Sequence, residues 1–129
     1  MVVWRPREGA VYLVRVEAGF AAAHFLRHYG GKCERLHGHN YKVRVWAKGP
    51  APGEGGMLLD FTALKGELRA VLEGLDHSLL NDEAAFQDDP SAERIAEFVF
   101  KALALRLPLA PLHAVEVFET ETSMARYEP

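Results

Sequence analysis

The spacing of apolar side chains changes twice along the chain, and this change constrains the fold more than any other feature of the sequence. Apolar and polar residues alternate over 11–20 and again over 40–49, which is typical of strands. A period of 3.6 residues follows over 61–74 and from about 91 to Pro108, which indicates two helices. Alternation returns over 113–120 and 123–128. The sequence therefore predicts the order strand, strand, helix, helix, strand, strand.

This order favours an α+β domain in which two helices pack on one face of a four-stranded antiparallel sheet. Asp60 is expected to cap the first helix and Pro108 to end the second. A chain of 129 residues, 49% of them hydrophobic, suits a single domain over residues 1–129 with one core. The second face of the sheet keeps apolar side chains to cover, so we expect self-association into a homo-oligomer.

The composition narrows the choice of partners. A formal net charge of −3 provides no general basic surface, so nucleic acid is not an expected partner. No apolar run approaches the roughly 20 residues of a membrane-spanning helix, and the first residues lack the pattern of a secretory signal. We therefore expect no membrane association and a cytoplasmic location. Cys33 is the single cysteine, so it is either free for metal binding or catalysis, or a buried and inert thiol.

A His-Gly-His sequence lies at the start of the second predicted strand. His37 and His39 are two residues apart, so in a strand they project from the same face and could bind one metal ion. The alternative is a chance pair on a surface strand. Three histidines with one open position are the pattern of catalytic zinc, which leaves a third ligand to be found. The candidates are the remaining histidines: His24 and His28 nearby, and His77 and His113 further along the chain.

Five short motifs span Phe20 to Thr120: "FAAAH", "CERLHGHNY", "MLLDF", "LDHSLLN" and "VFET". In this order they resemble the 6-pyruvoyl-tetrahydropterin synthase superfamily. The resemblance implies Zn²⁺ as cofactor, with His24, His37 and His39 as its ligands. It also implies the tunnelling fold, in which subunit sheets join into a barrel, usually a hexamer of two stacked trimers with active sites at subunit interfaces.

The spacing from Cys33 to His37, "CxxxHGH", looks like that of the bacterial 6-carboxy-5,6,7,8-tetrahydropterin synthases, whereas animal pyruvoyl enzymes have a longer insertion there. The implied reaction converts 7,8-dihydroneopterin triphosphate into 6-carboxy-5,6,7,8-tetrahydropterin, releasing acetaldehyde and triphosphate, as a step towards queuosine. Two alternatives are a pyruvoyl-type elimination of triphosphate at the same metal site, and a zinc-stabilised assembly module without turnover.

The resemblance also implies roles in proton transfer. Cys33 is a candidate general base, because Lys32, Arg35 and a nearby zinc would lower its pKa from the ordinary value of about 8.5. Asp76 and His77 would form a second proton-transfer pair, since a carboxylate can orient an imidazole and support its charged form. The alternative places His77 at a helix C-terminus, where it only meets the helix dipole.

The remaining implied residues bind substrate. Glu119 matches the pterin anchor of the superfamily, because a carboxylate can accept two parallel hydrogen bonds; strand alternation alone favours an exposed glutamate such as Glu116 instead. Ser91 matches a hydroxyl near the pterin, but capping of the second helix explains it equally well. The candidates for binding the triphosphate are three cationic residues between the first two predicted strands: Arg27, Lys32 and Arg35. They could also be ordinary solvated charges.

Overall fold

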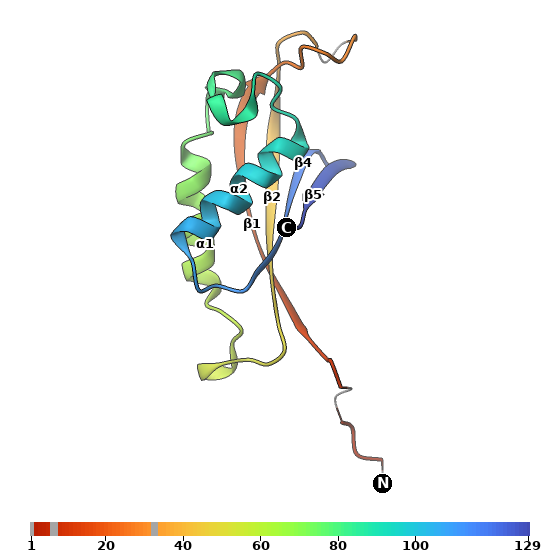
Figure 1. Cartoon of the computed structure of the whole chain (residues 1–129), viewed down its shortest axis with the longest axis vertical. Helices are drawn as coiled ribbons and strands as arrows, with labels where there is room; N and C mark the ends of the chain where they lie inside the picture. Colours follow the sequence, from red (N-terminus) through yellow and green to blue (C-terminus); the bar gives the residue numbers. More distant parts are fainter. Residues whose placement is uncertain (1, 6–7, 32–33) are drawn as a thin grey trace.

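The structure is a computed structural model, and it describes residues 2–5, 8–31 and 34–129. Two long strands come first and are followed by a helix, a very short strand, a second helix and two final strands (Figure 1). The elements are β1 (Tyr12–His24), β2 (His37–Gly49), α1 (Phe61–Glu73), β3 (Ser78–Leu79), α2 (Ala92–Arg106), β4 (Leu112–Thr120) and β5 (Ser123–Tyr127). Three 3-10 turns lie wholly within the described residues: η2 (Glu54–Gly56), η3 (Leu80–Asp82) and η4 (Ala84–Phe86).

The sheet is five-stranded and mixed, in the order β3-β1-β2-β4-β5. The α+β class and the two helices are as predicted, but the four-stranded, purely antiparallel sheet was wrong in detail, because β3 adds a parallel edge strand beside β1. β3 forms only two pairs, Ala22 with Ser78 and Ala23 with Leu79. A strand of this length has no periodicity to detect in the sequence.

Both long strands extend further towards the histidines than the sequence predicted. The alanines before His24 favour neither strand nor loop by themselves. β1 continues through them because β2 pairs with it over its whole length, from Tyr12 opposite Gly49 to His24 opposite His37. Tertiary pairing of this kind routinely overrides weak local preference. The loop between the strands is therefore shorter than predicted.

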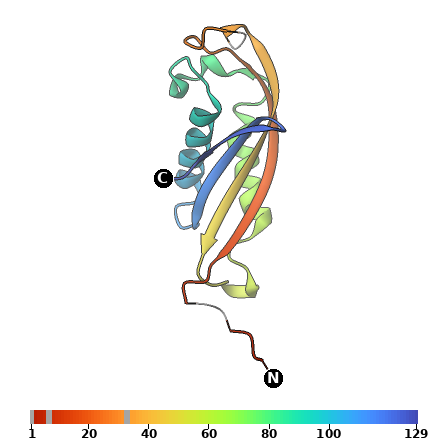
Figure 2. The ribbon, with the colours of Figure 1, turned by 90° about the vertical axis from the view of Figure 1, so that its right-hand side faces the viewer.

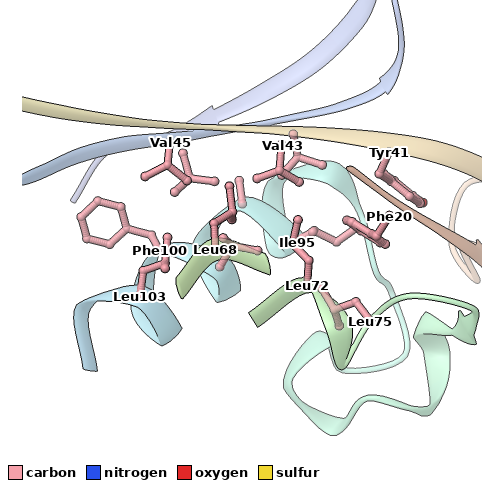
Figure 3. Close-up of a cluster of buried hydrophobic side chains, with 14 of the residues drawn as sticks. Phe20, Tyr41, Val43, Val45, Leu68, Leu72, Leu75, Ile95, Phe100 and Leu103 are labelled. Atoms are coloured by element: carbon pink, nitrogen blue, oxygen red, sulfur yellow. The ribbon is translucent and has the colours of Figure 1, made fainter. Parts of the chain in front are cut away.

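The two helices cover one face of the sheet, as the view in Figure 2 shows. Asp60 caps α1 by accepting a hydrogen bond from the Thr62 backbone N–H at 2.8 Å, and Ser91 caps α2 through the Arg94 N–H at 3.2 Å. The core lies between the layers (Figure 3), where strand side chains meet the buried stripes of both helices. Its members include Phe20, Tyr41, Val43, Val45, Leu68, Leu72, Ile95 and Leu103.

The opposite face of the sheet is lined by charged and aromatic side chains. The Arg44 Nε donates to Glu17 at 2.7 Å, and the Trp46 indole N–H donates to Glu116 at 2.7 Å, while Arg126 lies over the Trp46 ring. The sequence predicted an apolar surface on this face, and the structure shows a largely polar one. Homo-oligomer formation stays a prediction, but an uncovered apolar face no longer supports it. Among the described residues, no helix is both long enough and apolar enough to cross a membrane.

Candidate functional site

Pairing of β1 with β2 brings three histidines together at one end of the sheet. His24 lies directly opposite His37, and His39 lies opposite Ala22 on the same pair of strands. The three imidazoles project from the face that the helices cover, and each offers a ring nitrogen within 4.8 Å of the other two. Of the two nearby candidates for a third ligand, the structure brings His24 into this cluster. His28 is instead exposed, with its ring 3.8 Å from the Asp89 carboxylate.

The backbone fixes which nitrogen of two rings faces the centre of the cluster. The Nδ1 of His24 lies 2.8 Å from the Pro90 carbonyl oxygen, and the Nδ1 of His37 lies 2.7 Å from the Arg35 carbonyl oxygen. A carbonyl oxygen only accepts, so each Nδ1 carries the proton of a neutral ring. The two Nε2 atoms, 2.9 Å apart, then point lone pairs at each other. This contact is repulsive unless a proton or a metal cation lies between them.

Burial favours the neutral, metal-binding form of the rings. His24 exposes 1% of its surface, and the Nε2 of His39 is buried with no hydrogen-bond partner among the described residues. Burial lowers the pKa of His24 and of His39. Neutral imidazoles whose second nitrogen donates to a carbonyl are the usual arrangement of histidine metal ligands. The cluster therefore fits a divalent metal ion that accepts nitrogen ligands.

Glu119 places a carboxylate beside the histidine cluster. It continues the buried phase of β4, after Val115 and Val117, and its Oε1 lies 4.0 Å from the Nε2 of His24. Its side chain is 28% exposed. Strand alternation alone favours an exposed glutamate like Glu116 here, but that prediction is wrong. Glu116 lies on the opposite face, where its side chain is 13% exposed and accepts a hydrogen bond from Trp46 at 2.7 Å.

Asp76 and His77 form a contacting pair at the β1 edge of the sheet. The Nδ1 of His77 lies 2.9 Å from the Asp76 carboxylate, whose other oxygen accepts the Ala21 backbone N–H at 2.9 Å. This backbone bond and the His77 ring lower the pKa of Asp76. His77 has a φ of 55°, a left-handed backbone conformation that turns its ring back onto the preceding residue, and its side chain is 82% exposed. The pair thus presents an oriented imidazole to solvent.

Comparison with known proteins identifies the family. The sequence pattern of the family described as 6-pyruvoyl tetrahydropterin synthase matches residues 13–129. The chain belongs to this family. A relative from Synechocystis, named 6-carboxy-5,6,7,8-tetrahydropterin synthase, is 40% identical over 91% of this chain and 93% of its own length. A Bacillus subtilis protein of the same name is 38% identical over 84% of this chain and 80% of its own length.

The fold agrees with a solved structure of the same synthase family. The structure of Caenorhabditis elegans 6-pyruvoyl tetrahydropterin synthase superposes with a TM-score of 0.83 and 26% identity, covering 98% of this chain and 99% of the other. The resemblance seen in the motifs is thereby confirmed over most of the chain. The relatives at 40% and 38% identity carry the name of the bacterial branch that the motif spacing indicated.

The cationic side chains predicted to bind the triphosphate do not share one environment. Arg27 is already paired: its guanidinium contacts Asp88, and its backbone N–H donates to Asp89 at 2.9 Å. Arg35 is exposed, and its carbonyl orients His37. Lys32 lies outside the described residues, as does the catalytic candidate Cys33. Ser91 caps α2, so of its two predicted roles the structural one is observed and the pterin contact stays a prediction.

Tyr41 lies beside the histidine cluster, whereas the sequence predicted only that it belongs to a strand. Its ring stacks on Phe20 at 4.7 Å and meets the edges of His24 and His39 at 5.9 and 5.3 Å. Its hydroxyl is buried without a hydrogen-bond partner among the described residues, and burial, with the nearby Glu119, raises its pKa. The signal was present in the sequence, because Tyr41 continues the spacing of His37 and His39 on one strand face.

Proposed function

We propose that the chain is a zinc-dependent 6-carboxy-5,6,7,8-tetrahydropterin synthase that acts on 7,8-dihydroneopterin triphosphate and releases acetaldehyde and triphosphate, as a lyase of queuosine precursor synthesis. The observation that carries the proposal is the three-histidine cluster with Glu119 at 4.0 Å from His24. The relatives that bear this name at 40% and 38% identity support the choice of reaction. We propose a single domain over residues 1–129 and a cytoplasmic location.

His24, His37 and His39 are the proposed ligands. Three neutral imidazoles leave one position of a tetrahedral zinc ion free for substrate, and they suit zinc better than magnesium or calcium, which prefer oxygen. When bound, zinc would supply Lewis acidity, which eases deprotonation of a hydroxyl or of a carbon beside a carbonyl.

Glu119 is the proposed anchor for the pterin ring. A carboxylate in this position can accept hydrogen bonds from the ring N–H and the amino group together, which fixes the ring in its plane. Because Glu119 is partly exposed and next to His24, a pterin held there would extend its side chain over the histidine cluster. Orientation of this kind can lower the barrier of the following chemical step substantially.

Proton transfer is assigned to Cys33 and to the pair Asp76 and His77. Cys33, the proposed general base, comes four residues before His37 in the sequence. Asp76 holds the His77 ring at 2.9 Å and would stabilise its protonated form. Since the His77 ring is largely exposed, we propose that a neighbouring subunit completes the site, in a hexamer of two trimers. Contacts to substrate from Ser91, and to the triphosphate from Arg27, Lys32 and Arg35, belong to the same proposal.

Product identification tests the reaction. The zinc-loaded protein is incubated with 7,8-dihydroneopterin triphosphate, and pterins and acetaldehyde are quantified. The proposal predicts 6-carboxy-5,6,7,8-tetrahydropterin and acetaldehyde in equal amounts. A 6-pyruvoyl product without acetaldehyde would indicate the reaction named for the C. elegans structure, and the absence of any turnover would indicate an assembly module.

A further inference from the structure

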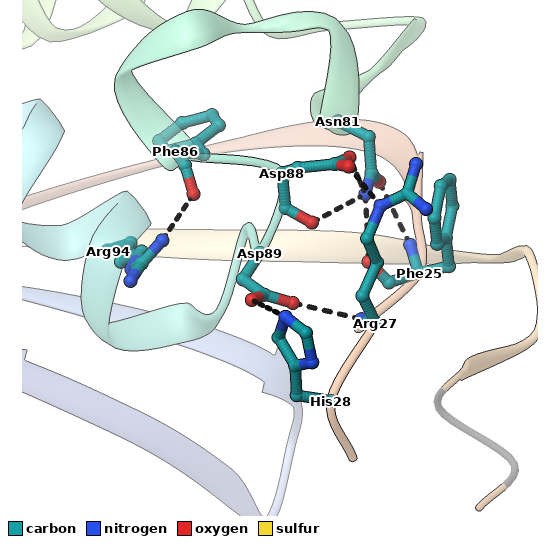
Figure 4. A network of polar contacts seen from close by, with 8 residues as sticks. All are labelled: Phe25, Arg27, His28, Asn81, Phe86, Asp88, Asp89 and Arg94. Atoms are coloured by element: carbon teal, nitrogen blue, oxygen red, sulfur yellow. Dashed lines mark hydrogen bonds and ion pairs between the residues drawn. The ribbon is translucent and has the colours of Figure 1, made fainter. Parts of the chain in front are cut away.

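A network of polar contacts surrounds the end of β1, outside the site itself (Figure 4). It joins the segment just after His24 to the loop that runs from η3 to the start of α2. This loop carries the Pro90 carbonyl, which accepts from His24. Arg27 and His28 contact the loop directly, through Asp88 and Asp89. Asn81 in η3 adds a side chain that contacts both segments at once.

The Asn81 amide binds both backbone groups of Phe25. Its Oδ1 accepts the Phe25 N–H at 3.0 Å, and its Nδ2 donates to the Phe25 carbonyl at 2.9 Å. A paired donor and acceptor of this kind is what a neighbouring strand would supply, so Asn81 extends the ladder on β1 one residue past its end. Phe25 directly follows His24, so this contact also fixes the backbone from which the His24 ring projects.

The same amide nitrogen reaches the loop on the other side. Asn81 Nδ2 lies 3.1 Å from the carbonyl oxygen of Asp88 and 3.1 Å from its carboxylate. Asp88 has a φ of 63°, a left-handed conformation that non-glycine residues adopt only when contacts support it. Two residues further on, Pro90 presents its carbonyl oxygen to the Nδ1 of His24 at 2.8 Å.

We propose that Asn81 is a positioning residue for the metal site: by tying Phe25 to Asp88, it sets the distance between the His24 ring and the Pro90 carbonyl. That carbonyl selects the ring form whose Nε2 is free to face His37 and His39. The proposal rests on the proposed function for its metal, but the state of the His24 ring can also be measured in the metal-free protein. The ion that this site would bind is a divalent metal ion that accepts nitrogen ligands.

The matched control is Arg94, which holds the same loop at a different point. Arg94 Nη1 donates to the Phe86 carbonyl at 2.6 Å and its backbone N–H to Ser91, and among the described residues no hydrogen bond joins it to the segment after His24. Asn81→Ala and Arg94→Ala each remove an anchor of the loop, so both should lower the thermal midpoint. A purely structural role for Asn81 predicts that the two variants also behave alike towards metal.

The first readout is zinc affinity, measured by competition with a chromophoric chelator. Asn81→Ala should weaken zinc binding by about ten- to hundredfold, the range found when partners of metal ligands are removed, whereas Arg94→Ala should change it by less than about threefold. Wild-type affinity in folded Asn81→Ala, or equal weakening in both variants, would overturn the proposal. If Asn81→Ala does not fold, Asn81→Asp replaces it, since it keeps the acceptor for Phe25 and loses the three contacts that the amide nitrogen donates.

The second readout is the protonated nitrogen of His24 in the metal-free protein, observed by ¹⁵N–¹H NMR of the imidazoles. Wild type and Arg94→Ala should carry the proton on Nδ1, and the Asn81 variant should show a mixture of both ring forms. An unchanged Nδ1 proton in the Asn81 variant contradicts the proposal even if no metal binds. Failure of wild type to bind zinc, with the mixture still seen, would instead count against the proposed function alone.

Discussion

Replacing Glu119 by glutamine separates anchoring of the pterin from metal binding. The substitution keeps the size of the side chain but removes its charge and one of the two acceptors that face a pterin. The side chain is 28% exposed and its Oε1 lies 4.0 Å from the Nε2 of His24, so in the proposed complex the carboxylate would bind the substrate and would not be a ligand of the metal. Charge-assisted hydrogen bonds contribute roughly 1.5–3 kcal/mol, which corresponds to a loss of about ten- to hundredfold in pterin affinity.

The assay is titration of the zinc-loaded Glu119→Gln protein with a pterin that lacks the reactive side chain. Zinc content should equal that of wild type, and with full substrate the main effect should be on KM, with a smaller one on kcat. Glu116→Gln is the matched control, because Glu116 lies on the same strand but on the opposite face, against Trp46 and Arg126. It should leave pterin affinity unchanged. Wild-type affinity in Glu119→Gln would refute the anchoring role.

Three further predictions concern the metal ligands, the thiol and pH. His37→Ala and His39→Ala should each lose most bound zinc in metal analysis, and full retention by both would remove the ligand assignment. Cys33→Ala should keep the zinc and the thermal midpoint but lose turnover, so a wild-type rate would end the role of the thiol as base. Burial lowers the pKa of His24 and His39 below 6.5, so the unfolded state binds more protons just below that pH. The free energy of unfolding of the metal-free protein, from urea titrations, should therefore fall as the pH drops from 7.5 to 5.5, and a flat profile would contradict the buried neutral rings.

The sequence predicted the elements with strong periodicity well. The helix predicted over 61–74 is Phe61–Glu73 in the structure, and the one expected from Ser91 or Ala92 is Ala92–Arg106. In both cases a capping side chain and an apolar stripe agree, so local and tertiary preferences lead to the same boundaries. The two final strands were predicted with similar accuracy, since alternation continues through them.

The parts that the sequence missed depend on pairing between distant segments. The alanines of β1 become a strand because β2 lies beside them, and β3 is too short to leave a pattern. His24 was expected between the two predicted strands and His37 at the start of the second, yet the two residues face each other across β1 and β2. Residue spacing alone could not distinguish His24 from His28; the motif resemblance made that choice, and the strand register explains it.

The position of Glu119 also required the strand phase from the structure. In β4 the residue shares the face of Val115 and Val117, whereas alternation read from the sequence alone favoured an exposed glutamate such as Glu116. The polar network at Asn81 was invisible in the sequence, because its partners lie 56 and 7 residues away and bind mostly through backbone atoms. Such contacts leave no signature in residue type.

The central claim is a zinc ion held by His24, His37 and His39, and anomalous X-ray scattering from crystals of the zinc-loaded protein tests it most directly. Data on either side of the zinc absorption edge would locate the ion without reference to any expected position. The account predicts one peak per subunit among the three imidazoles, about 2.0–2.1 Å from a nitrogen of each ring. A fully occupied zinc peak elsewhere in the subunit, with none between these histidines, would contradict it.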